Sequence, residues 1–251
     1  MLVKDKVAII TGGGSGIGRA TANRYAEHGA DVVVADVDVE GGERTAAEIV
    51  ADDGEATFVE TDVVNPEDVQ AVIEAARTEY GGLDVMVNNA GIEGPLSDID
   101  EYDNADFERV IDVNLKGVWY GTKYAIQAML ENGRGAIVNT ASVAALVAVP
   151  GRGGYGATKA GVSNMTKTAA VEFARDDIRV NAVAPGVVET PMQQRARDVK
   201  LDRPDRYIKQ EAMEGGSDPV ELANAILFLG SDLASRISGV TLPVDGGMTA
   251  K

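Results

Sequence analysis

Tyr155 and Lys159 are the two side chains whose types and spacing most clearly suggest chemistry. They stand four residues apart, so on a helix the phenol and the ammonium lie on one face. A phenol can give a proton to an oxygen or take one from it, but its ordinary pKa of about 10 makes it a poor base near neutrality. An exposed cation stabilises the phenolate by only about 0–1 kcal/mol. The pair therefore predicts acid–base chemistry only in a partly desolvated site.

A second stretch, residues 11–18 (TGGGSGIG), is suited to binding a pyrophosphate. It follows the apolar run 7–10 and leads into a helical pattern, so it lies where a buried strand turns into a helix. Glycines permit close backbone approach, and the N–H groups at a helix start favour an anion. Asp36 ends the next apolar segment, 18 residues after Gly18. A carboxylate there can accept hydrogen bonds from the adenosine ribose, which predicts a nicotinamide dinucleotide.

The surroundings of Asp36 favour NAD over NADP. Its carboxylate would repel a 2′-phosphate, Val37 supplies no cation, and residues 12–18 contain neither Arg nor Lys.

Taken singly, a glycine run also forms ordinary turns, and a Tyr/Lys pair at helical spacing is usually a surface pair. The combination is what predicts a proton donor beside a nicotinamide ring.

The composition of the chain argues against several other classes of catalytic site, metal site and binding partner. The chain has 251 residues, no cysteine and one histidine, His28, so a thiol nucleophile, a thiolate metal site and a Ser/His/Asp triad are close to excluded, and we expect no metal. The formal charge of -17 argues against nucleic-acid or anionic-membrane partners and is also what adaptation to a salty cytoplasm would produce. Because no signal-peptide or bilayer-spanning pattern is present, we expect a cytoplasmic protein.

Alternating strand and helix patterns must position these residues. Strands are expected at 6–11, 31–36, 56–60, 83–87, 135–140, 178–183 and 240–244, and helices at 17–28, 42–51, 66–80, 103–132, 155–175 and 219–229. All-apolar strands between helices indicate an α/β fold, a doubly wound (Rossmann-type) parallel sheet of about seven strands with helices on both faces. We expect one domain over 1–251, with the ligand at the carboxyl ends of the strands.

The charged stretch at about 190–217 has no clean periodicity. Such a stretch between two core elements is commonly a mobile flap over a site, although a plain surface excursion is nearly as good an interpretation.

The glycine spacing Gly-x-x-x-Gly-x-Gly differs from the commonest dinucleotide fingerprint. It resembles that of the short-chain dehydrogenase/reductase family of the classical type. Further motifs match that family in order: residues 88–91 (NNAG) after the fourth strand, Asn114, Ser142, and Tyr155 and Lys159 at 13 and 17 residues beyond the serine, then 185–186 (PG). The resemblance covers residues 6–247.

This resemblance implies roles for individual residues. Tyr155 is implied as general acid/base, Lys159 as the group that lowers its pKa and binds the nicotinamide ribose, and Ser142 as the group that orients the substrate oxygen. Asn114 is implied to support a water that carries the proton outward, but it could equally be a satisfied interior amide. The residues implied to bind the cofactor are Gly12, Ser15, Gly16, Ile17, Gly18, Asp36, Asp62, Val63, Asn89, Ala90, Gly91, Tyr155, Lys159, Pro185, Gly186, Val188 and Thr190.

The implied reaction is hydride transfer between a secondary alcohol and NAD, giving the ketone. The expected substrate-side residues are mostly apolar, which suits a hydrophobic alcohol, whereas Glu93 and Gln193 could serve a polyol or sugar. These expected residues are Glu93, Leu96, Val143, Ala144, Ala145, Leu146, Val149 and Met192. A 3-oxoacyl-thioester reductase, a glucose 1-dehydrogenase and a non-catalytic nucleotide-binding relative stay open as alternatives; the intact Ser/Tyr/Lys set disfavours the last.

The two longest helical patterns carry more apolar residues than one sheet face needs. In relatives these helices pair between subunits and the chain's end meets a neighbour, so the resemblance implies a homotetramer with two-fold axes. The alternative is that these residues only fill the internal core. They are Val118, Trp119, Tyr120, Met129, Val162, Met165 and Val171.

Overall fold

A parallel sheet forms the centre of the molecule in the computed structural model, which describes residues 1–192, 213 and 215–250. Within those residues the sheet has seven strands in the order β3-β2-β1-β4-β5-β6-β7, and every neighbouring pair is parallel. The strands are β1 (Val7–Thr11), β2 (Asp31–Asp36), β3 (Glu55–Glu60), β4 (Val85–Asn88), β5 (Gly135–Thr140), β6 (Ile178–Pro185) and β7 (Thr241–Val244). The predicted doubly wound sheet is confirmed, and its order reverses between β1 and β4.

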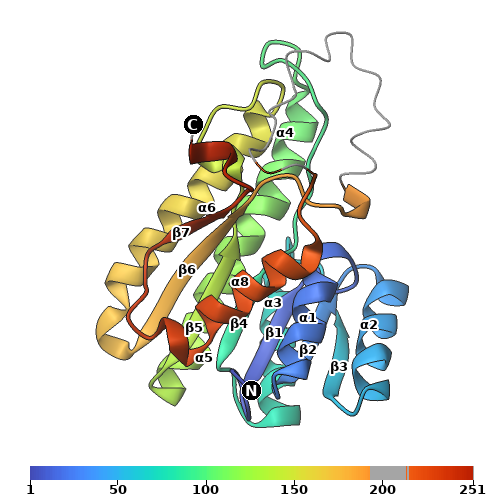
Figure 1. Ribbon diagram of the computed structural model, residues 1–251, viewed down its shortest axis with the longest axis vertical. Helices are drawn as coiled ribbons and strands as arrows, with labels where there is room; N and C mark the ends of the chain where they lie inside the picture. Colours follow the sequence, from blue (N-terminus) through green and yellow to red (C-terminus); the bar gives the residue numbers. More distant parts are fainter. Residues whose placement is uncertain (193–212, 214, 251) are drawn as a thin grey trace.

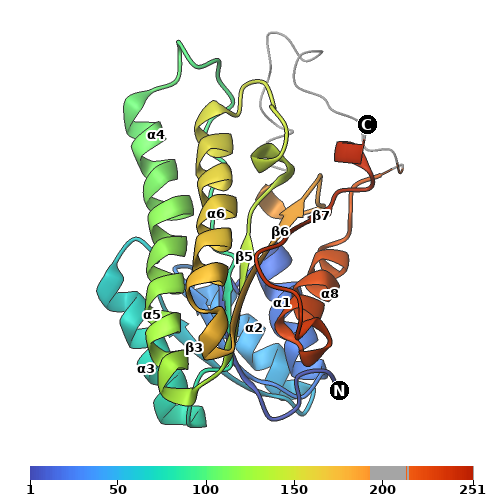
Figure 2. The ribbon, with the colours of Figure 1, turned by 90° about the vertical axis from the view of Figure 1, so that its left-hand side faces the viewer.

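Helices cover both faces of the sheet (Figure 1). One layer holds α1 (Gly16–Glu27), α2 (Val39–Ala51) and α8 (Pro219–Gly230), and the other α3 (Pro66–Tyr80), α5 (Gly117–Asn132) and α6 (Gly153–Glu172). Figure 2 shows α5 and α6 on one side of the sheet and α1 and α8 on the other. The short α4 (Asn104–Ile111) leads into α5. This arrangement leaves the carboxyl ends of the strands open between the layers.

Side-chain alternation along the strands divides the core in two. Ile9 and Val33 pack with α3 and α5, whereas their neighbours Ile10 and Val34 pack with α1 and α8. Successive residues of a strand point to opposite faces, so a strand covered on both sides must be apolar throughout. This is why β1 reads as the continuous run VAIIT.

Some element boundaries differ from those expected. Helix α2 begins at Val39 rather than 42, with Asp38 as its N-cap residue, so Gly42 lies inside the helix, where it packs against the ring of Phe58. The helix expected over 103–132 contains a π-helical turn, Asp112–Lys116. Strand β6 runs to Pro185 instead of ending before it, and α6 ends at Glu172, short of 175. The other ends agree with the expected ones or differ by at most two residues.

Most of the stretch expected to form a flap, 193–212 and residue 214, lies outside the described residues. Its two ends lie side by side, because Glu189 N–H donates to Ser217 O (3.0 Å) and Ser217 N–H donates to Val187 O (2.8 Å). The stretch therefore leaves and rejoins the fold at one place, beside the end of β6.

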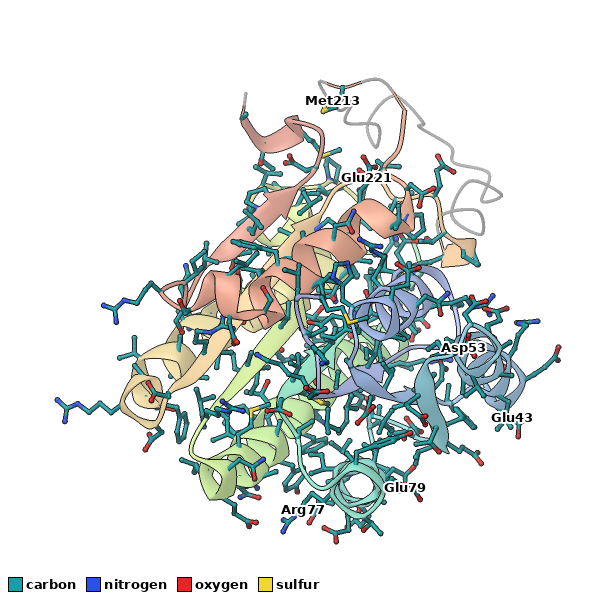
Figure 3. The ribbon with its side chains drawn as sticks, turned by 60° about the horizontal axis from the view of Figure 1, so that its bottom comes forward. Glu43, Asp53, Arg77, Glu79, Met213 and Glu221 are labelled. Carbon is teal, nitrogen blue, oxygen red and sulfur yellow. The ribbon has the colours of Figure 1, made fainter. Side chains whose placement is uncertain are left out.

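Acidic side chains project from the outer surface. Glu43, Asp53, Glu79 and Glu221, labelled in Figure 3, are all exposed and come from α2, the turn after it, α3 and α8. Carboxylates in these positions remain hydrated, so salt can screen their mutual repulsion. Among the described helices, none combines the length and apolar content that crossing a bilayer requires.

Candidate active site

A cleft of about 790 Å³ opens at the carboxyl edge of the sheet, above the point where the strand order reverses. A doubly wound sheet offers its ligand site at this position. The segments that follow β1, β2, β3, β4, β5 and β6 all contribute to its wall. Of the site residues named from the sequence, those that line the cleft are Gly12, Ser15, Gly16, Ile17, Asp36, Asp62, Val63, Asn89, Ala90, Gly91, Ser142, Tyr155, Lys159, Pro185, Gly186, Val188 and Thr190. Gly18 and Asn114 lie behind this wall.

The turn after β1 brings the backbone close to the cleft. Gly12 has a φ of +66°, and a Cβ on Gly18 would lie 1.9 Å from the Gly12 carbonyl oxygen, so only glycine fits at position 18. Helix α1 begins at Gly16, and its first N–H groups have no partner within the helix. With the positive end of the helix dipole, they make a cradle that suits a pyrophosphate.

Thr11 and Asn89 join the ends of β1 and β4. The Thr11 hydroxyl oxygen accepts from the N–H groups of Asn89 (3.0 Å) and Ala90 (3.1 Å), and the Asn89 side-chain amide donates to Thr11 O (3.0 Å). These bonds set the floor of the cleft. The sequence analysis missed Thr11, although a threonine between an apolar strand and a glycine turn was a signal for it.

Asp36 is held at the end of β2 with its carboxylate toward the glycine turn. One oxygen accepts from Gly14 N–H (2.8 Å) and the other from Asp38 N–H (2.9 Å). The next residue, Val37, is 65% exposed. Of the described residues that line the cleft, the cations are Arg109, Arg152 and Lys159. Arg19 of α1, which is not one of them, donates to Gly14 O beside Asp36.

Ser142, Tyr155 and Lys159 meet on the opposite side of the cleft. Ser142 caps a short 3₁₀ turn, its hydroxyl accepting from Ala144 N–H (3.2 Å), and it shares a hydrogen bond with the Tyr155 phenol. Lys159 is buried; its Nζ donates to Thr140 O (2.7 Å) and lies 5.6 Å from the centre of the Tyr155 ring. The arrangement presents a hydroxyl and a phenol side by side, with an ammonium beneath them.

The protein alone keeps this tyrosine protonated. Burial raises the pKa of Tyr155 to about 12; the hydrogen bond with Ser142 and the charge of Arg152 lower it, while Glu93 raises it. Burial also lowers the pKa of Lys159 to about 8. Lys159 is not among the groups that shift the pKa of Tyr155 here, and its ammonium donates to the Thr140 carbonyl oxygen.

Asn114 occupies the π-helical turn and is fully buried. Its Oδ1 accepts from Ile92 N–H (2.8 Å) and its Nδ2 donates to Ile92 O (2.7 Å). The side chain therefore fixes the loop after β4, as a satisfied interior amide would. π-helical turns of this kind are frequent at functional sites.

The substrate side is partly as expected. Val143, Ala144, Val149, Met192 and Glu93 line the cleft. Leu96, Ala145 and Leu146 do not, and Gln193 lies outside the described residues. Arg152, Val187 and Met248 are among the lining residues that the sequence analysis missed.

Comparisons with known proteins agree with this geometry. A family profile described as "Enoyl-(Acyl carrier protein) reductase" matches residues 12–249. The chain is 40% identical to a cyclohexanol dehydrogenase of Acinetobacter sp. (strain SE19), over 98% of this chain and 96% of that protein. It is 42% identical to a cis-4-hydroxycyclohexanecarboxylate dehydrogenase of Sinomonas cyclohexanicum, over 98% and 97%. The crystal structure of levodione reductase superimposes with a TM-score of 0.93 at 38% identity, covering 98% of each chain. The chain therefore belongs to the short-chain dehydrogenase/reductase family.

Proposed function

We propose that this protein is an NAD-dependent dehydrogenase of cyclic secondary alcohols, with Tyr155 as general acid/base. Several of its relatives are named as dehydrogenases or reductases of secondary alcohols and the corresponding ketones. The observation that carries the proposal is the meeting of Ser142, Tyr155 and Lys159 in the same cleft as the glycine turn. We infer that residues 1–251 act as one catalytic domain, since a single sheet runs through the described chain.

The residues of the cleft suit a nicotinamide dinucleotide, which members of this family use. That group would supply the hydride acceptor for alcohol oxidation and the hydride donor for ketone reduction. Its phosphates fit the Gly12–Gly18 cradle described above, and its adenosine ribose fits the Asp36 carboxylate. Asp62 and Val63 offer a wall for the adenine, and Val188 and Thr190 close the cleft at its nicotinamide end.

In oxidation, Tyr155 takes the proton of the substrate hydroxyl while the hydride leaves the carbinol carbon, and the product is the ketone. In reduction the phenol returns that proton to the ketone oxygen. Ser142 holds the same oxygen by a hydrogen bond. A pKa of about 12 for Tyr155 suits the proton-donating direction. Oxidation needs the phenolate, which a positive charge in the cleft, as on an oxidised nicotinamide, would favour.

NAD is proposed over NADP because of the corner around Asp36. A 2′-phosphate placed beside this carboxylate would meet a fixed negative charge, while the nearby Arg19 guanidinium is already bound to Gly14 O and Thr45 Oγ1. Two charges of one sign at close range are strongly unfavourable in a partly desolvated cleft. The same point weighs against a 3-oxoacyl-thioester reductase, which usually prefers NADPH.

Cyclic substrates are proposed on two grounds. The wall beside Tyr155 is largely aliphatic, with Val143, Val149 and Met192, which suits a compact hydrocarbon ring. The names of several relatives describe activity on six-membered rings, among them cyclohexanol and levodione.

We also propose that the chain forms a homotetramer through α5 and α6. Trp119 is 54% exposed and Val171 is 80% exposed, and large exposed apolar residues on neighbouring helices are typical of subunit contacts. Val118, Met129 and Val162, which the sequence analysis also assigned to this surface, are buried in the core.

A cytoplasmic location is proposed because a chain without cysteine gains no disulfide from an oxidising compartment; cell fractionation would test it.

Replacing Tyr155 by Phe should abolish turnover of cyclohexanol with NAD. The variant lacks the hydroxyl that exchanges the proton, a role worth roughly 10²–10⁴-fold in rate. Cofactor-linked absorbance measures the rate, and calorimetric titration should show that NAD binding is nearly unchanged. Tyr80→Phe, a change at the end of α3 away from the cleft, serves as the matched control. A Tyr155→Phe variant that keeps most of its kcat would remove this residue from the mechanism.

Replacing Asp36 by Asn should lower the preference for NAD over NADP by roughly tenfold or more, since a unit of like charge near a phosphate is removed. The measurement is the ratio of kcat/KM for the two cofactors at one salt concentration. Asp53→Asn, an exposed change beyond the other end of α2, should leave the ratio as it is. An unchanged ratio in Asp36→Asn would contradict the assigned role.

The charges of Glu93 and Arg152 should move the pH profile of alcohol oxidation in opposite directions. Oxidation rises as pH passes upward through the pKa of Tyr155, because the phenolate is the base. Glu93 raises that pKa and Arg152 lowers it, so Glu93→Gln should shift the rise to lower pH and Arg152→Gln to higher pH. The measurement is kcat/KM against pH for both variants and the parent. Shifts in one common direction would refute the electrostatic assignment.

Replacing Trp119 by Glu should weaken assembly. A charge buried in an apolar contact costs several kcal/mol when unpaired, so multi-angle light scattering should show a smaller species than the parent tetramer. Val50→Glu on α2, also at an exposed apolar position (54%), is the matched control and should stay tetrameric. A parent protein that is monomeric at assay concentration would overturn the tetramer.

A further inference from the structure

The described wall of the cleft includes an ion pair, Glu93–Arg152, among aliphatic side chains. Arg152 Nη2 lies 2.6 Å from Glu93 Oε1, and the two side chains are only 14% and 21% exposed. Each of the other ion pairs in the described part of the chain has a partner that is at least 57% exposed. The Glu93–Arg152 pair thus differs from them in being shielded from water, and both of its members line the cleft.

Both members of the pair are anchored from behind. Glu93 follows Ile92, whose N–H and carbonyl are both bound by the buried Asn114 amide. Arg152 immediately precedes α6 and is three residues before Tyr155; its backbone bridges to Ser97, while Ser97 N–H donates to Gly151 O (3.1 Å). The backbone on either side of the pair is therefore held in place, and the ion pair joins the two side chains across the cleft wall.

Stability alone gives little reason for an ion pair at this position. Moving two charges out of water costs several kcal/mol per ion, and apolar residues of similar volume are often as stable or more so. In ligand pockets, by contrast, a few fixed polar groups in an apolar wall select the ligand. Glu93 and Arg152 are polar groups of this kind, because they line the cleft among aliphatic side chains.

We propose that Glu93 and Arg152 together bind a second hydroxyl group of the substrate, so that the enzyme prefers cyclic diols to cyclic alcohols with a single hydroxyl. This inference rests on the proposed function. A hydroxyl can donate to the carboxylate and accept from the guanidinium at once. A ketone oxygen would satisfy only the guanidinium, and a carboxylate would be repelled by Glu93. The hydroxyl is the group that matches both partners.

The reacting hydroxyl and the second hydroxyl can belong to one small ring. Glu93 and Arg152 line the same cleft as Tyr155, so the pair faces the cavity in which the substrate oxygen is oxidised. Arg152 also precedes Tyr155 by one helical turn. A compact ring held by Ser142 and Tyr155 at one hydroxyl would therefore present its other hydroxyl toward the pair.

The test compares cyclohexanol with the cis and trans isomers of cyclohexane-1,2-, 1,3- and 1,4-diol, using the full-length enzyme and NAD or NADP. We expect at least one diol to have a kcat/KM roughly tenfold or more above that of cyclohexanol, because a site built to hydrogen-bond a hydroxyl discriminates against the analogue without it. The ratio of the two kcat/KM values is the readout, since it cancels general losses of activity.

Two variants then test the pair itself. Glu93→Gln keeps the shape but removes the charge. The double variant Glu93→Leu/Arg152→Met replaces both charged side chains by apolar ones, so neither member of the pair is left as a buried charge without the other. Both should lower the diol-to-cyclohexanol ratio by roughly tenfold. Asp232→Asn breaks the Lys6–Asp232 pair, which has the same 2.6 Å separation at the other end of β1, and should leave the ratio unchanged.

The outcomes separate this inference from the function on which it rests. If the parent oxidises cyclohexanol but prefers no diol, or if its diol preference survives in both variants, the subsite is wrong and the proposed function stands. If the parent oxidises neither cyclohexanol nor any diol with either cofactor, the proposed function fails and the subsite fails with it.

Discussion

The Thr11 hydroxyl, which accepts from the N–H groups of Asn89 and Ala90, holds β1 and β4 together at the point where the strand order reverses. In a doubly wound sheet the connections on the two sides of this point run to opposite faces, so a crevice opens there. The cleft owes its floor to these bonds. The glycine turn can lie close to that floor because residue 18 is glycine. Any side chain at this position would clash with the carbonyl oxygen of Gly12.

Desolvation governs the chemistry of the opposite wall. Burial disfavours the charged form of both catalytic candidates, so the pKa of Tyr155 is raised and that of Lys159 is lowered. The ammonium is held by the Thr140 carbonyl oxygen instead of by the phenol. Under the proposed function, the charge that a bound cofactor brings would set the direction of proton transfer, which would couple acid–base chemistry to the redox state.

The described part of the substrate side combines aliphatic side chains with the shielded Glu93–Arg152 ion pair. Asn114 contributes to it indirectly, because it clamps Ile92 and thereby positions Glu93. The π-helical turn that carries Asn114 joins α4 to α5, so the loop after β4 and the helix that follows it are set as one unit. Differences in this loop and in the start of α6 are therefore a physical route by which relatives on the same fold could select different ring substituents.

The amino-acid sequence by itself determined the α/β alternation, the glycine turn, the acid at the end of β2 and the order of the chemical motifs. These are local properties: apolar runs, glycine and fixed spacings between residues a few positions apart. The tertiary structure alone decided that Arg152 meets Glu93, that Lys159 binds the Thr140 carbonyl, and that Val118 is buried and not at a subunit surface. Each of these depends on how a crossover packs against the sheet, and burial, which sets the pKa values, exists only after that packing has formed.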